Sequence, residues 1–263
     1  MNSVQSTFDY IKNNFPISQW LNSDYPNGVG IANPTSGNIM TTIKNIGDSG
    51  LDTSISGGNV TQIGSRWYQN GGANDKPYWY VLQNAQESFW FPPEPNGVTG
   101  TNFGICYAIV TSDNVALSNF GACVSRGGGP SPLNVNLYGY PTNNQRLLNE
   151  WAGSLYPYRN TDGTTGYPNR IAVNQPYCGI YNIVGNGVLS KSYTFNQAAG
   201  IGNSANTGII TKTAFNNAGG TYFGTRSTAQ ERYKLYEYIL FKRELSVEEI
   251  YKVQNYFKLK YNQ

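Results

Sequence analysis

The last forty residues of the chain constrain its fold more than any other segment. Residues 235–241 are almost wholly apolar or aromatic, which predicts a β-strand buried on one face and largely covered on the other. Glu237 interrupts this run, and a carboxylate buried there needs a polar partner. A strict two-residue period puts three apolar residues on the face that Glu237 shares: Leu235, Ile239 and Phe241.

A short helix should follow this strand. Ser246 and Glu249 have the spacing of a capping box, in which each side chain bonds the backbone N–H of the other residue. Three apolar residues then recur at helical spacing: Ile250, Val253 and Phe257. A helix this short is marginal alone, so residues 246–259 should form a C-terminal helix that docks this stripe on the body of the fold.

The same tail carries a family resemblance. The stretch from Glu237 to Ser246, EYILFKRELS, is followed by four further matching residues, Glu249, Tyr256, Lys260 and Tyr261. This pattern resembles the closing signature of concanavalin A-like, laminin-G-like jelly-roll domains, with Phe-Lys-Arg at 241–243 where Tyr-Asn-Arg is usual. Residues 18–23, SQWLNS, resemble the opening segment of that family. The resemblance implies a jelly-roll sandwich of the kind found in structural proteins of phages and other viruses.

Composition agrees with an all-β fold. Thirty glycines and thirteen prolines supply frequent turns, and the aromatic residues favour strands. We therefore predict an antiparallel two-sheet β-sandwich with a short C-terminal α-helix, as one domain over residues 1–263. An amphipathic start with Phe8, Ile11 and Phe15 favours a helical segment within residues 1–22 that packs on a neighbouring chain. The clearest predicted strands are 103–111, 115–125, 133–138, 177–184, 188–195 and 207–212.

Charge and hydropathy exclude several partners. The net charge is only +3, and charged residues make up 13% of the chain. This argues against nucleic acid, whereas a neutral surface rich in amides and aromatic rings suits sugars or protein neighbours. Residues 1–15 lack the cationic start and apolar core of a secretory signal, and no apolar stretch is long enough to insert in a membrane.

The sequence also argues against catalysis. There is no histidine, which removes histidine-dependent nucleophilic catalysis and histidine-containing metal sites. Laminarinase-type glucanases of the jelly-roll fold carry E-x-D-x-x-E on one strand, and this motif is absent. We therefore predict that the chain is not an enzyme and has neither catalytic residues nor a bound cofactor.

Two minor features are left open. The oxygen-rich segments 48–52 and 160–163 are the only compact candidates for calcium, although each is more typical of a side-chain-capped turn. The three cysteines lack metal spacing and favour buried thiols, with a Cys106–Cys123 bridge as the alternative.

One long segment is the best candidate for binding. Residues 149–170 show neither strand nor helix periodicity, which predicts a loop, and loops of this length are usually functional. Aromatic rings can stack on sugars or pack against a protein, while amides and arginine supply directional hydrogen bonds. The predicted glycan- or partner-binding residues are Trp151, Tyr156, Tyr158, Arg159, Asp162, Tyr167 and Asn169. The alternative is that these aromatic residues pin the loop to its own domain.

Three aromatic triplets are predicted to lie in the core and not to bind a ligand. Residues 66–68, 78–80 and 89–91 each hold three large side chains in a row, and in a strand the middle one faces away from the outer two. At least one side of each triplet should therefore lie in the core.

Two functions fit these features best. The first is a non-catalytic surface or structural protein of a virus particle, such as a head-decoration, fibre or tail protein, that assembles with itself or other virion proteins and binds host glycans. Such a protein needs no secretory signal because lysis releases it. The second is a free-standing carbohydrate-binding module of a secreted protein, and a glycoside hydrolase is disfavoured by the missing motifs.

Overall fold

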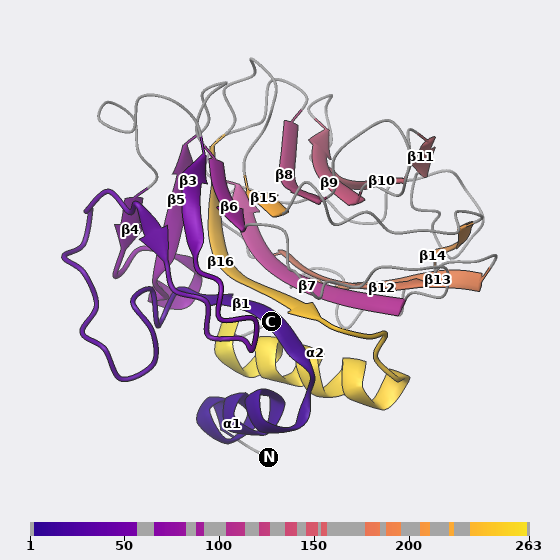
Figure 1. The fold of residues 1–263 in the computed structure, drawn as a ribbon, viewed down its shortest axis with the longest axis horizontal. Helices are drawn as coiled ribbons and strands as arrows, with labels where there is room; N and C mark the ends of the chain where they lie inside the picture. Colours follow the sequence, from indigo (N-terminus) through magenta and orange to yellow (C-terminus); the bar gives the residue numbers. More distant parts are fainter. Residues whose placement is uncertain are drawn as a thin grey trace.

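The computed structural model describes residues 3–56, 66–82, 88–91, 104–113, 121–126, 135–140, 146–151, 154–156, 177–184, 188–195, 206–210, 221–223 and 232–261. These residues form a mostly β structure with an α-helix near each end of the chain (Figure 1). Every strand pairing among them is antiparallel. The predicted all-β class with a short C-terminal helix is therefore confirmed.

The first sheet is centred on the last strand of the chain. Its order is β14-β13-β12-β7-β16-β5-β4, and β1 also pairs with β16, beyond the end of β5. Its strands are β1 (Ile17–Asn22), β4 (Arg66–Tyr68), β5 (Tyr78–Leu82), β7 (Gly104–Asp113), β12 (Tyr177–Val184), β13 (Val188–Phe195), β14 (Asn206–Ile210) and β16 (Arg232–Phe241). A single turn of 3-10 helix, η1 (Ala73–Asp75), lies in the connection between β4 and β5.

The remaining strands form a second sheet with the order β11-β10-β9-β8-β15-β6-β3-β2. They are β2 (Thr42–Ile43), β3 (Thr53–Ser56), β6 (Ser88–Phe91), β8 (Gly121–Arg126), β9 (Val135–Tyr140), β10 (Arg146–Trp151), β11 (Ser154–Tyr156) and β15 (Thr221–Phe223). Strands β12 and β13 have the bounds that the sequence predicts, and β7, β8, β9 and β14 overlap the predicted segments.

The predicted loop over residues 149–170 is wrong at its start. Residues 149–151 belong to β10, and β11 follows at once and pairs with it. The sequences of β10 (RLLNEW) and β11 (SLY) do not alternate between apolar and polar residues, so the pairing of the two strands defines them and no sequence period does. Residues 157–176 lie outside the described part of the chain.

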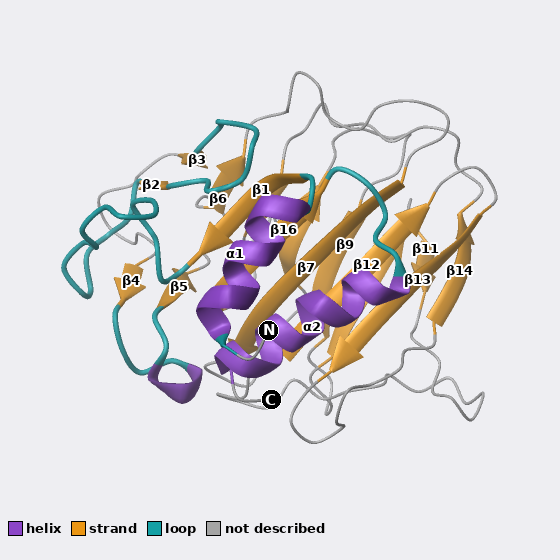
Figure 2. Cartoon of the chain, turned by 90° about the horizontal axis from the view of Figure 1, so that it is seen from below, coloured by secondary structure: helices purple, strands orange, loops and turns teal. Residues whose placement is uncertain are grey.

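The N-terminal helix packs on its own chain. Helix α1 (Val4–Asn14) begins after Ser3, whose hydroxyl accepts a hydrogen bond from the backbone N–H of Ser6 at 3.1 Å. Phe8 and Ile11 are 4% and 0% exposed, and the Phe8 ring lies 4.8 Å from that of Trp20. The predicted helix is confirmed, but its apolar stripe packs on the first sheet and not on a neighbouring chain. Figure 2 shows α1 and α2 (Val247–Tyr261) covering the same face of that sheet.

Strand β16 contains a β-bulge. Its register against β7 shifts between Leu235 and Glu237, and the extra residue changes which side chains share a face. Tyr236, in place of the predicted Leu235, joins Ile239 and Phe241 in the core beneath the helices. The predicted position of Leu235 is therefore wrong. The predicted cover of both faces is confirmed, because every residue from 235 to 241 is at most 2% exposed.

The capping box of α2 forms as predicted. The backbone N–H of Ser246 donates to Glu249 Oε2 at 2.9 Å, and that of Glu249 donates to Ser246 Oγ at 3.3 Å. Arg243 adds a bidentate pair, with Nη1 and Nη2 at 2.8 and 2.7 Å from the two carboxylate oxygens of Glu249. These hydrogen bonds, those of Arg243 foremost, lower the pKa of Glu249 from 4.5 to about 2.

We expect stability to fall in acid partly through this cap. The folded chain keeps Glu249 charged down to about pH 2, whereas the unfolded chain protonates it near pH 4.5. The unfolded state therefore binds more protons in this window, and the free energy of unfolding should fall as pH falls through it. The free energy of unfolding, measured with denaturant at several pH values, should depend less steeply on pH in Glu249→Gln. The control Glu248→Gln changes a carboxylate that is 80% exposed and should keep the original slope. If the stability of Glu249→Gln depended on pH as steeply as that of the unaltered chain, Glu249 would not be the source of this acid sensitivity.

Candidate functional site

The structure brings two of the seven predicted site residues into one hairpin. In the β10–β11 ladder, Trp151 pairs with Ser154, and Asn149 pairs with Tyr156. This hairpin ends the second sheet, because β11 is its last strand. The other five predicted residues lie outside the described part of the chain: Tyr158, Arg159, Asp162, Tyr167 and Asn169.

The oxygen-rich segment 48–52 is a capped turn. Asp52 Oδ1 accepts the backbone N–H of Asn45, and its Oδ2 pairs with Lys44 at 2.8 Å. Asp48 pairs instead with Lys242. Among the described residues no group of three or more cysteine or acidic side chains could hold a metal ion. The segment 160–163 is outside the described residues.

Two cysteine side chains are described, and neither forms a disulfide. Cys106 and Cys178 are fully buried in the core beneath the helices. Cys106 lies on β7 of the first sheet, whereas residue 123 lies on β8 of the second, so the two are not neighbours in a hairpin. The alternative of a Cys106–Cys123 bridge is therefore wrong. No helix in the described part of the chain has the length and apolar character to cross a membrane.

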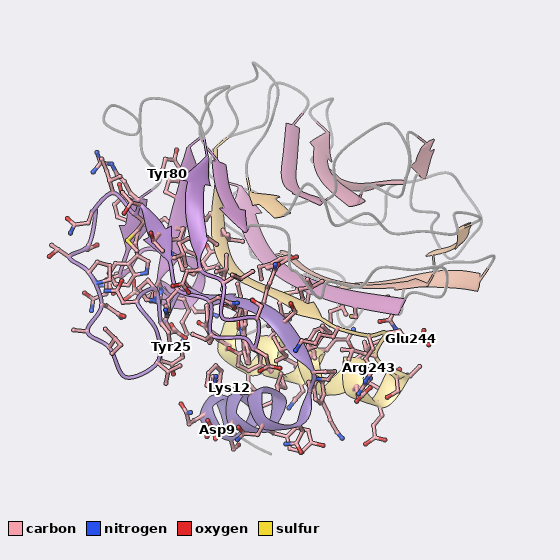
Figure 3. The ribbon with its side chains drawn as sticks, viewed as in Figure 1. Asp9, Lys12, Tyr25, Tyr80, Arg243 and Glu244 are labelled. Carbon is pink, nitrogen blue, oxygen red and sulfur yellow. The ribbon has the colours of Figure 1, made fainter. Side chains whose placement is uncertain are left out.

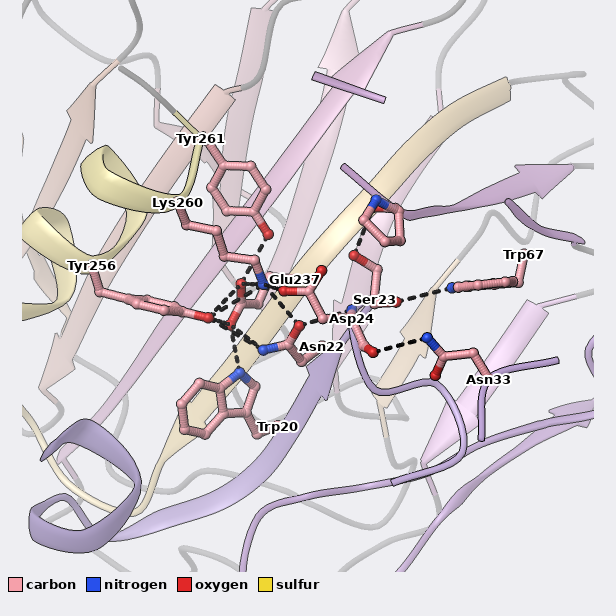
Figure 4. A network of polar contacts seen from close by, with 11 residues as sticks. Trp20, Asn22, Ser23, Asp24, Asn33, Trp67, Glu237, Tyr256, Lys260 and Tyr261 are labelled. Atoms are coloured by element: carbon pink, nitrogen blue, oxygen red, sulfur yellow. Dashed lines mark hydrogen bonds and ion pairs between the residues drawn. The ribbon is translucent and has the colours of Figure 1, made fainter. Parts of the chain in front are cut away.

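A buried polar centre joins β1, β16 and α2 (Figure 4). The carboxylate of Glu237 is its hub. Oε1 accepts hydrogen bonds from Trp20 Nε1 at 2.7 Å and from the Tyr256 hydroxyl at 2.9 Å. Oε2 accepts from Lys260 Nζ and from the Tyr261 hydroxyl, both at 2.9 Å. Asn22 Nδ2 also donates to Oε1 at 3.3 Å, so five donors satisfy one buried carboxylate, and the predicted need of Glu237 for polar partners is confirmed.

Lys260 carries the compensating charge. Its Nζ lies 2.9 Å from Asp24 Oδ2 and donates to Asn22 Oδ1 at 2.8 Å, in addition to its bond with Glu237. Burial alone disfavours the ammonium, but the charges of Glu237 and Asp24 outweigh it and raise the pKa of Lys260. Burial, followed by the charge of Glu237, raises the pKa of Tyr256 well above its usual range.

This polar centre has a structural role. Its six residues are each at most 2% exposed, so no ligand can reach them: Trp20, Asn22, Glu237, Tyr256, Lys260 and Tyr261. The residues that carry the family resemblance in the tail meet Trp20 of the opening segment here. The resemblance therefore reflects how the two ends of the chain close on the first sheet, and ligand binding must be sought elsewhere.

A more accessible cluster lies on β4 and β5 at the edge of the first sheet. The register pairs Tyr68 with Tyr78, and Arg66 with Tyr80. These four side chains are half-buried and share one face with Lys234 of β16, which pairs with Tyr80. Between them Trp67 and Trp79 face the opposite side and are 0% exposed, which confirms the predicted core role of these two triplets. We call Arg66, Tyr68, Tyr78, Tyr80 and Lys234 the tyrosine face.

The rings of the tyrosine face are ordered by packing. Those of Tyr68 and Tyr78 are stacked, with centroids 5.2 Å apart and planes inclined by 17°. Lys234 Nζ lies 4.5 Å from the centroid of Tyr78 and donates to the carbonyl of Gly71 at 2.9 Å. Burial lowers the pKa of Lys234 and raises that of Tyr78, to which Tyr68 adds.

The connection from β4 to β5 folds closely over this cluster. A Cβ on Gly72 would lie 2.3 Å from the carbonyl oxygen of Lys76 and 2.7 Å from Cε1 of Tyr236, so only glycine fits. On the other side, the backbone N–H of Gly37 donates to the Trp67 carbonyl at 2.7 Å. Among the described residues, the hydroxyl groups of the three tyrosines of this face neither donate nor accept a hydrogen bond. As far as the described residues go, three rings and three hydroxyl groups without a hydrogen-bond partner are therefore open to a ligand.

The tyrosine face was missed as a site by sequence reasoning. Its aromatic triplets were predicted to lie in the core, and the sequence pattern does not predict that the outer two residues of a triplet stay half-exposed. A usable signal was the spacing of Tyr68 and Tyr78 around a turn rich in Gly and Asn, which predicts a hairpin with facing rings. In Figure 3, Tyr80 lies toward the upper left, away from Arg243, which lies toward the lower right near the start of α2.

The fold resembles those of enzymes that act on carbohydrates. No protein-family model and no curated protein matches the sequence. Among solved structures, a GH54 α-L-arabinofuranosidase soaked with a cyclic sulfate inhibitor matches with a TM-score of 0.59 and 11% identity, over 84% of this chain and 51% of that chain. An arabinofuranosidase complexed with arabinofuranosyl-α-1,2-xylobiose has a TM-score of 0.57, 11% identity and the same coverage.

A sialidase from Trypanosoma rangeli matches nearly the whole of this chain. The TM-score is 0.52 and the identity 11%, over 98% of this chain but only 38% of the sialidase. This chain thus spans about half the length of the arabinofuranosidases and about two fifths of that of the sialidase. At such identities the matches establish a shared β fold.

These matches contradict the prediction that the chain is not an enzyme. The chains that share the fold are named as glycoside-cleaving enzymes, so its fold is one that enzymes use. The error has a physical cause. A missing E-x-D-x-x-E motif excludes one arrangement on one strand, whereas glycoside cleavage requires only two carboxyl groups at a suitable separation, and different strands or loops can supply them. The missing histidines do not bear on such a pair.

Proposed function

We propose that the chain is a carbohydrate-recognising domain built as a two-sheet, concanavalin A-like sandwich over residues 1–263. The helices cover one face of the first sheet, yet β16 is also buried on its other face, where Tyr238 and Leu240 are at most 2% exposed. A second sheet packed on that face would account for this burial. The proposal of a single sandwich rests on these buried residues and on the pattern of the tail.

The tyrosine face carries the functional part of the proposal. Its half-exposed rings can stack on the C–H faces of a sugar, and its free hydroxyl groups can bond to sugar hydroxyls. The packing of Tyr78 between Tyr68 and Lys234 orders the platform before ligand binds, which lowers the entropic cost of binding. The solved structures of similar fold belong to proteins named for their action on saccharides, which supports the same class of ligand.

The β10–β11 hairpin and the segment after it stay a second predicted binding surface. Trp151 and Tyr156 are placed in one hairpin, which is compatible with a joint role. A position in a virus particle, with self-assembly or virion partners, also stays a prediction, because no contact of the described residues bears on it.

Glycan-array binding tests the proposal. Tyr68→Ala with Tyr80→Ala should weaken binding of any recognised saccharide by at least tenfold, because aromatic anchors dominate such contacts. Tyr251→Ala is the matched control, since this tyrosine is 48% exposed on α2, and it should bind like the unaltered chain. Thermal unfolding shows whether each variant is folded. A double variant, Trp151→Ala with Tyr158→Ala, is tested on the same array. It measures the contribution of the second surface to binding.

The results separate the two surfaces. Loss of binding in the folded tyrosine-face variant supports the proposal. Full binding by that variant, or no saccharide bound by the unaltered chain, would overturn it. Loss only in the Trp151 and Tyr158 variant would assign recognition to the second surface instead.

A further inference from the structure

We infer that the saccharide bound at the tyrosine face carries a carboxylate, held by Arg66. This inference rests on the proposed function and specifies its ligand. Both charged residues of the face are cationic, Arg66 and Lys234, and none of its five residues is acidic. The nearest acidic residue of the β4–β5 connection, Asp75, accepts the backbone N–H of Gly71 at 2.9 Å on the exposed turn. The charge of the face therefore complements an acidic ligand.

Arg66 is held in a way that leaves a binding fork. Its Nη1 donates to the carbonyl of Gly37 at 2.6 Å, which fixes the guanidinium plane. No other hydrogen bond engages this side chain among the described residues, so the N–H groups of Nε and Nη2 remain. These two donors point in parallel and match the two oxygens of a carboxylate. Because Nη1 already anchors this half-buried side chain, Arg66 loses little conformational entropy when Nε and Nη2 bind a carboxylate.

Lys234 contributes charge without direct contact. It is only 8% exposed, and its ammonium is already engaged by the Gly71 carbonyl and the ring of Tyr78. Its positive charge still raises the potential over the face. Arg66 lies directly across the ladder from Tyr80, so the two side chains are cross-strand neighbours on the tyrosine face. A sugar ring on the tyrosines can thus place an acidic substituent at Arg66.

An added peptide strand fits this edge poorly. Strand β4 ends the first sheet, but its outer side is already occupied by residues 37–39. Ile39 forms a bridge with Arg66, and the N–H of Trp67 donates to the Asn38 carbonyl at 3.1 Å. With its backbone groups used in this way, β4 offers a ligand its side-chain face and no free ladder.

Calorimetric titration with matched sugars tests the inference. The probes are three acidic sugars with neutral counterparts. Cellotriuronate and cellotriose, like trigalacturonate and galactotriose, differ in carboxylates at C6 of each unit, and sialyllactose differs from lactose by its sialic acid unit. At least one acidic member should bind the unaltered chain at least tenfold more tightly than its neutral partner. Arg66→Lys keeps the charge but loses the fork, and should abolish most of that preference. Tyr80→Phe should weaken both members of a pair alike, because it removes a hydroxyl and no charge.

Two controls keep the result interpretable. Lys258→Gln removes an exposed cation from α2 and should leave the preference unchanged. Thermal unfolding of Arg66→Lys and Tyr80→Phe verifies that both fold. If neutral and acidic partners bind equally well, and Tyr80→Phe still weakens binding, the inference is overturned while the proposed function stands. If no probe binds, and the glycan array is also empty, both are overturned.

Discussion

Replacing Lys260 with methionine should lower the free energy of unfolding by about 3–5 kcal/mol, because the carboxylate of Glu237 would then be buried without its cation. Glu237 is 0% exposed and Lys260 is 2% exposed, so water cannot take over the role of the ammonium. Methionine nearly matches the lysine stem in volume, which limits the loss to the charge and its hydrogen bonds. Denaturant unfolding at neutral pH measures the change.

A double-mutant cycle isolates the ion pair. Lys260→Met combined with Glu237→Gln should cost less than the sum of the two single changes, by at least about 1 kcal/mol. Asp24 keeps contact with water in both backgrounds because its side chain is 29% exposed. The matched control Lys258→Met changes an exposed lysine of the same helical turn and should stay within about 0.5 kcal/mol of the unaltered chain. If the free-energy changes of the two single variants simply added in the double variant, the ion pair of Glu237 and Lys260 would contribute nothing to stability.

Phe257→Asp should destabilise the chain by several kcal/mol, as should Ile250→Asp, because each buries a charge without a partner. Both residues are 0% exposed in the core between α2 and the first sheet. The ring of Phe257 also packs 5.5 Å from that of Tyr256, which belongs to the polar centre. The melting temperature, followed by circular dichroism, should fall by many degrees.

Leu259→Asp is the control for these changes. Leu259 lies on the same helix but is 37% exposed, so an aspartate there can reach water. Its effect should be well under half that of Phe257→Asp. If Phe257→Asp melted like the unaltered chain, α2 would not be docked on the sheet.

These stability effects connect to the proposed binding surface through β16. The strand carries Lys234 at the tyrosine face, Tyr236 in the helix-side core and Glu237 in the polar centre, within four consecutive residues. Tyr236 packs 6.2 Å from Tyr78 and 5.6 Å from Tyr261, ring to ring. Loss of the polar centre should therefore loosen the tyrosine face as well as the helix.

Local signals in the sequence were enough for much of the fold. The Ser246–Glu249 capping box and the apolar stripe of α2 formed as predicted, because both depend on residues within a few positions of one another. The bounds of β12 and β13 were predicted correctly for the same reason, because each is a local run rich in apolar, aromatic and β-branched residues. Contacts between distant segments were harder to predict. The partners of Glu237 include Trp20, which is 217 positions away in the sequence.

By itself, the sequence determined an all-β chain with a capped C-terminal helix and a buried acidic residue in need of partners. Only the tertiary structure decided that a bulge turns Tyr236 toward the helices, that α1 packs on its own sheet, and that Arg66 and three tyrosines share a half-exposed face. The reason is physical. Strand and helix periods act over a few residues, whereas strand register, bulges and the exposure of a face depend on which distant segments pair and pack.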